Sequence, residues 1–149
     1  MTLLERGERK KISDNVLLVL ASMAFYKKPI EGRTRFQKIV YLLKKKSQIP
    51  FDFNFKPYYY GPYSEELSDL ITFLTALKLA EEKTDYLGKG IIRYNYELTD
   101  KGKRYFEKFK ESADRETLND IKKLRKVVSE LRTFPTAKLI SEAKSLMRN

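Results

Sequence analysis

Residues 83–102, KTDYLGKGIIRYNYELTDKG, decide which fold this chain can adopt. Two short runs, 83–87 and 91–98, flank Gly88-Lys89-Gly90, and polar and apolar residues alternate along the second run. This pattern predicts a β-hairpin with a tight turn. Thr99 follows directly and is a good N-cap for the next helix. The segment therefore predicts two antiparallel strands that lead straight into a helix.

Three amphipathic helices are predicted before the hairpin, because apolar residues recur at helical spacing. Ser13 or Asp14 is expected to cap the first helix. The second opens with a possible capping box, Thr34 and Gln37, and the third begins after Ser64, another good N-cap. The expected helices run from 13 to 27, from 34 to before Pro50, and from 64 to about 82.

Other segments complete the expected order of elements. Phe51, Phe53 and Phe55 alternate with polar residues, which predicts a short strand with one apolar side. After the hairpin, apolar spacing predicts a helix from Thr99, a helix over about 114–132, and a last short helix after Pro135.

Three helices, a hairpin and a helix form the element order of a winged helix. Residues 96–102, YELTDKG, resemble the end of the wing in many winged-helix regulators, where a Leu enters the core and a Thr caps the next helix. The resemblance implies a mainly α fold with a β-hairpin (α+β), that is, a winged-helix-like domain with extra C-terminal helices. We expect residues 1–112 to form this domain. Residues 113–149 are expected to be a helical extension that dimerises, without being an independent domain.

A second pattern joins residues 32–43, GRTRFQKIVYLL, to residues 59–64, YYGPYS, and Leu67. These segments are similar to two prokaryotic families, the YwgA-like family and the Panacea antitoxin domain, also called SocA-like. The resemblance covers about residues 33–77 and implies a small intracellular domain that acts as a regulator, an antitoxin or an adaptor. Phe36 and Ile39 stand where the family pattern often has Leu.

The amino-acid composition excludes several classes of active site and metal site. The chain has 149 residues with no Cys and no His, which excludes thiol nucleophiles, imidazole bases and His or Cys metal sites. We therefore expect a binding protein, not an enzyme, without metal or cofactor. No apolar run approaches the roughly 20 residues of a membrane span, and the N-terminus lacks a signal-peptide pattern. A cytoplasmic protein without a membrane partner is expected.

The excess of positive charge suggests a partner that carries phosphates. There are 31 Lys and Arg residues against 20 Asp and Glu, a net charge of +11, and clustered cations bind phosphates by releasing counterions. We predict a small transcriptional regulator that binds double-stranded DNA as a homodimer. A charged thermophile surface would explain the same excess without a partner. The predicted DNA contacts are Arg33, Arg35, Lys38, Lys45, Lys46, Lys89, Arg93 and Lys101.

The predicted third helix argues against the usual DNA-reading mode. Residues 62–82 contain five acids and one base, so this helix would repel phosphates. The competing hypothesis is a protein-interaction module of the antitoxin or adaptor kind, whose partner is a toxin or a regulator. It would dock through this acidic helix and a tyrosine-rich turn, although at least two of the tyrosines are expected to pack over the core instead. These tyrosines are Tyr58, Tyr59, Tyr60 and Tyr63.

Overall fold

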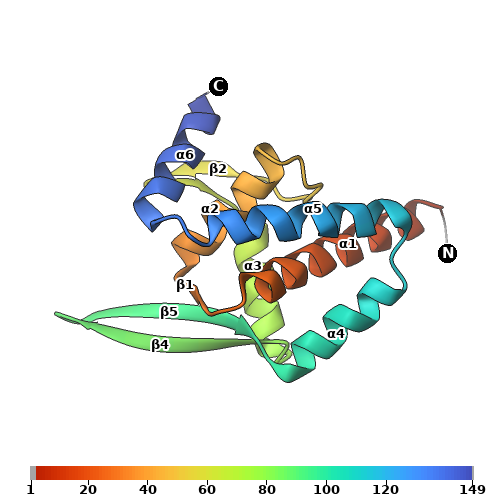
Figure 1. The fold of residues 1–149 in the computed structure, drawn as a ribbon, viewed down its shortest axis with the longest axis horizontal. Helices are drawn as coiled ribbons and strands as arrows, with labels where there is room; N and C mark the ends of the chain where they lie inside the picture. Colours follow the sequence, from red (N-terminus) through yellow and green to blue (C-terminus); the bar gives the residue numbers. More distant parts are fainter. Residues whose placement is uncertain (1–2, 149) are drawn as a thin grey trace.

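The structure is a computed structural model that describes the backbone of residues 3–148 and the side chains of residues 14–148 (Figure 1). Over that range the chain forms a mixed α+β fold of six helices and two small antiparallel sheets. The elements are α1 (Leu3–Tyr26), β1 (Ile30–Glu31), α2 (Arg33–Lys45), β2 (Lys56–Tyr58), β3 (Gly61–Tyr63), α3 (Glu65–Ala76), β4 (Ala80–Gly88), β5 (Ile91–Leu98), α4 (Asp100–Glu111), α5 (Arg115–Leu131) and α6 (Thr136–Arg148).

The predicted hairpin is confirmed as β4 and β5, which pair antiparallel, and β1 adds a short third strand in the order β1-β5-β4. The turn residues Gly88, Lys89 and Gly90 all have positive φ, a conformation that glycine adopts without steric cost. The sequence of elements is that of the predicted α+β, winged-helix-like class. The outer half of the hairpin projects away from the helices (Figure 1).

The core lies around α1 and α2. Residues 17–21 of α1 are all buried, so this helix is covered on every side. α5 runs beside α1, and α6 packs on α2 (Figure 1). The apolar stripe of α5, including Ile121, Leu124 and Val128, is thus buried within the chain. The predicted homodimer relied on this stripe, and it stays a prediction without that support.

Two predicted helix starts are wrong. α1 begins at Leu3, so Ser13 and Asp14 lie inside the helix and not at its cap. The N-cap of α2 is Gly32, which has no side chain to form a cap bond, and Gln37 bonds to Ser64 instead of closing a capping box. By contrast, the Ser64 hydroxyl accepts from the Leu67 amide at 3.2 Å, as predicted.

The predicted strand over residues 51–55 is also wrong. Phe51 and Phe53 are both buried and their rings stack at 5.7 Å, in a segment without strand pairing. The strands of this region are β2 and β3, which pair with each other after it. The alternation of the phenylalanines therefore reflects packing onto the core by a loop.

Candidate functional site

Two predicted phosphate contacts lie in the interior. Arg35 is 5% exposed and Lys38 is 2% exposed. The Arg35 Nε donates to the Tyr26 hydroxyl at 2.7 Å, and a terminal nitrogen donates to the Arg132 carbonyl at 3.0 Å. The expectation that Arg35 and Lys38 contact DNA phosphates is therefore wrong, because these side chains are closed off from a bound polyanion.

Lys38 joins the two sequence segments that carried the family resemblance. Its Nζ donates to the Pro62 carbonyl at 2.9 Å, and burial, aided by the neighbouring Lys144, lowers the pKa of Lys38 to about 8. Next to it, the Gln37 amide both donates to the Ser64 carbonyl and accepts from the Ser64 amide, each at 2.9 Å. The two segments are thus joined by a cluster of buried hydrogen bonds between α2 and the start of α3.

Arg33 joins three elements. Its Nε donates to the Tyr96 hydroxyl at 2.8 Å, and its terminal nitrogens donate to Ser68 at 2.5 Å and Thr72 at 3.0 Å. The Tyr96 hydroxyl in turn donates to Glu82 at 2.7 Å. Arg33 therefore connects α2 to α3 and to the hairpin. These hydrogen bonds use the guanidinium N–H groups with which Arg33 would bind a phosphate.

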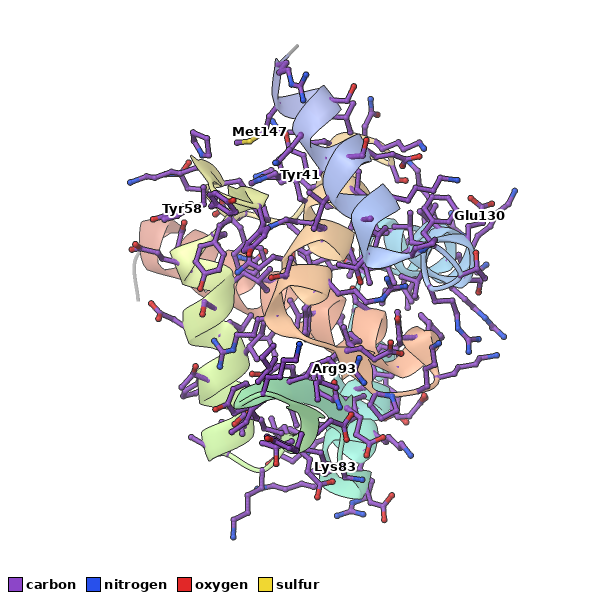
Figure 2. The ribbon with its side chains drawn as sticks, turned by 90° about the vertical axis from the view of Figure 1, so that its left-hand side faces the viewer. Tyr41, Tyr58, Lys83, Arg93, Glu130 and Met147 are labelled. Atoms are coloured by element: carbon purple, nitrogen blue, oxygen red, sulfur yellow. The ribbon has the colours of Figure 1, made fainter. Side chains whose placement is uncertain are left out.

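A groove of about 650 Å³ lies between the start of α2 and the hairpin, and it brings Arg33 and Arg93 together. Arg93 lies where the hairpin meets the first turn of α2, with its Cγ close to Gly32 (Figure 2). One Arg93 terminal nitrogen donates to Asp85 at 3.0 Å. Its Nε is buried without a hydrogen-bond partner among the described residues.

Besides Thr34 and Glu82, the rest of this groove is lined by large apolar and aromatic side chains, and such side chains continue onto the outer half of the hairpin. Five large side chains there are between 44% and 72% exposed. They are neighbours in the hairpin, since Tyr86 pairs across from Ile92 and Ile91 lies opposite Gly88. We call them the hairpin patch: Tyr86, Leu87, Ile91, Ile92 and Tyr94.

Sequence reasoning missed the hairpin patch. The alternation of Ile92, Tyr94, Tyr96 and Leu98 predicts one packed face, but only Tyr96 and Leu98 reach the core. Strand β5 extends beyond the helical part of the fold that it packs against, so its outer residues stay exposed to solvent. Large apolar residues directly beside a glycine-rich turn were the signal that could have found it.

The other predicted cations are exposed but do not gather on one face. Lys45 and Lys46 lie at the end of α2, where Lys46 pairs with Glu142 of α6 at 3.5 Å. Lys89 lies at the tip of the hairpin, and Lys101 lies at the start of α4 (Figure 1). The fold therefore does not assemble the predicted phosphate-binding surface of α2 and the wing.

The tyrosine-rich turn is more exposed than expected. Tyr58, Tyr59 and Tyr60 are 49%, 84% and 55% exposed, and Tyr63 is half-buried. The expectation that at least two of the four pack over the core is therefore wrong. The Tyr58 hydroxyl donates to Glu65 at 3.2 Å, which raises the pKa of Tyr58 and fixes the turn against α3.

The described residues contain no obvious metal site and no membrane helix. Within residues 14–148, no three Asp or Glu side chains converge as a metal centre would require. No helix in the described part of the chain has the length and apolar character needed to cross a bilayer.

The chain is similar to a bacterial protein of unassigned activity. It is 38% identical over 78 residues to the uncharacterized protein YwgA of Bacillus subtilis (strain 168). The matched part is 52% of this chain, and the chain spans about half, 46%, of the length of that relative. The match supports a YwgA-like relationship. No family model matches the chain.

Proposed function

We propose that this chain is a protein-binding module that docks its partner on the hairpin patch and the adjoining groove. The observation that carries the proposal is the exposure of five neighbouring large apolar side chains on one hairpin. A concentration of exposed large apolar side chains marks interaction sites on soluble proteins, because exposing them to water is unfavourable. Isoleucines and tyrosines at the tip would supply the buried centre of such an interface.

The backbone of β5 suggests what the partner offers. β1 pairs only with Asn95 and Tyr96, so residues 91–94 of β5 have no strand on that side within the described chain. This open edge borders the groove, where an extended segment of a partner could add a strand. The Arg93 guanidinium, which is partly exposed and pairs with Asp85, lies at this edge and could donate to a carbonyl or carboxylate of that segment.

The neighbouring helix α3 also suits a protein better than DNA. α3 runs between the tyrosine-rich turn, marked by Tyr58, and the hairpin, marked by Lys83 (Figure 2). Its exposed residues are acidic near its start and apolar near its end, where Phe73 is 55% exposed and Leu77 is 43% exposed. A phosphate backbone would be repelled by this surface.

The double variant Ile91→Ser/Ile92→Ser tests the docking proposal. The tagged chain captures partners from its source cells, a candidate is purified, and its Kd is measured with each variant. We expect Kd to rise at least about tenfold, the loss typical of interface anchor residues. Tyr105→Ser/Phe109→Ser is the matched control, because it removes exposed aromatic surface from α4, and it should leave Kd unchanged.

Equal affinities for the hairpin variant and the wild-type chain would contradict the proposal. Sedimentation velocity provides a second readout. A wild-type dimer that becomes a monomer in Ile91→Ser/Ile92→Ser would identify the partner as a second copy of this chain instead of another protein.

Binding of double-stranded DNA, as by a winged-helix regulator, is the second candidate function, and α4 favours it. Lys101, Arg104 and Lys108 are exposed and spaced to lie along one side of this helix. Anisotropy of a labelled duplex, titrated at about 50 and 200 mM salt, should show affinity that falls steeply with salt. Arg104→Gln/Lys108→Gln should weaken it more than Lys45→Gln/Lys46→Gln, and no binding at the lower salt would reject this candidate.

A further inference from the structure

We infer that a pocket between α1, α4 and α5 binds a small organic anion with an apolar body. The pocket has a volume of about 520 Å³, within the range of small-molecule sites. It lies apart from the hairpin groove, and the described residues that line the one do not line the other. Its floor is formed by Phe25, Leu118 and Ile121, and its rim carries Arg115, Lys122 and Arg125.

The floor is apolar and held in place. Ile121 is 4% exposed, and the Phe25 ring packs edge-on against Phe106 of α4 at 5.7 Å. The Arg125 guanidinium lies over the Phe25 ring, 5.4 Å from its centre. A ligand in this pocket would therefore contact apolar side chains together with a guanidinium that is already stacked over an aromatic ring.

The rim of the pocket carries positive charges, and most of them have no negatively charged partner among the described residues. Lys110 also lines the pocket, and it pairs with Glu107 at 3.0 Å. Within residues 14–148, Arg115, Lys122 and Arg125 form no ion pair. None of the described side chains that line the pocket is acidic. A concave site with charge of one sign attracts the opposite charge, so the pocket favours an anionic ligand.

The acids of α5 are kept on another side of the helix. Burial raises the pKa of Asp120 and the Glu116 carboxylate raises it further, while Lys123 lowers it. Neither of these acids is among the residues that line the pocket. The pocket therefore combines an apolar floor with free cations. This chemistry fits one anionic group, a carboxylate, sulfonate or phosphate, attached to an aliphatic or aromatic body.

Fluorescence titration with 8-anilinonaphthalene-1-sulfonate tests the site, because this probe joins an aromatic body to one sulfonate. We expect saturable binding whose Kd rises at least about tenfold in Lys122→Gln/Arg125→Gln, since charged hydrogen bonds are lost. Lys123→Gln/Lys126→Gln is the matched control. It removes the same charge from the same helix outside the pocket lining, and it should leave Kd nearly unchanged.

Competition identifies the source of the anion. Displacement of the probe by decanoate would assign an aliphatic carboxylate, and displacement by AMP would assign a nucleotide. Displacement by neither, equal Kd values for both double variants, or the absence of saturable binding would each overturn the inference. Methyl chemical shifts that move at Leu118 and Ile121 support it, and shifts confined to Ile91 and Ile92 of the hairpin would contradict it.

Discussion

Replacing Arg35 by alanine is expected to lower the free energy of unfolding by about 4 kcal/mol, although arginine is usually a surface residue. The guanidinium is almost fully buried and bonds to the Tyr26 hydroxyl, the Thr136 hydroxyl and the Leu131 and Arg132 carbonyls. The carbonyls lie at the C-terminal end of α5, where the helix dipole favours a cation. Alanine would leave two buried acceptors, the Tyr26 hydroxyl and the Leu131 carbonyl, and two partly buried ones without their donor.

Urea denaturation followed by circular dichroism measures this loss. Lys45→Ala on the same helix is the control, because Lys45 is exposed and its removal should change the free energy by less than about 0.5 kcal/mol. Arg35→Lys should recover only part of the stability, since an ammonium lacks the planar fork that reaches several acceptors. If Arg35→Ala were as stable as the wild-type chain, the buried guanidinium would make no net contribution to the fold.

Gly102→Ala is expected to destabilise the chain by about 3 kcal/mol, the upper part of the usual cost of overpacking. Gly102 lies in the first turn of α4, directly against the backbone of Leu79, and an added Cβ would collide with the Leu79 carbonyl oxygen. The backbone cannot easily move away, because the Thr99 amide donates to the same Leu79 carbonyl at 3.1 Å.

The sign of this effect distinguishes the close approach from ordinary helix propensity. At an exposed helix position, alanine in place of glycine would stabilise by about 1 kcal/mol. Here thermal unfolding should show Tm lowered by about 10 °C instead. Lys103→Ala, one residue further along α4 and exposed, should leave Tm nearly unchanged. An increase in Tm for Gly102→Ala would show that α4 is free to shift from Leu79.

The buried hydrogen bonds between α2 and the start of α3 show why a motif that resembles a family pattern is hard to interpret without a structure. Residues 32–43 and 59–64 were recognisable as a pattern, and cations in the first segment suggested a nucleic-acid surface. In the fold, Gln37 bonds to Ser64 and Lys38 bonds to Pro62. Part of the sequence pattern therefore reflects a buried contact. A residue type alone did not reveal whether its charge faces water or the interior.

The sequence by itself determined part of the local structure, although two helix starts and the strand over residues 51–55 were predicted wrongly. The hairpin and the caps Ser64 and Thr99 depend on residues a few positions apart, so their spacing was sufficient to predict them. Tertiary structure alone decided what lies far apart in the chain. The pairing of Ile30 with Tyr96, the burial of Arg35 and the exposed hairpin patch depend on how much core is available to cover each element, and no local pattern encodes that quantity.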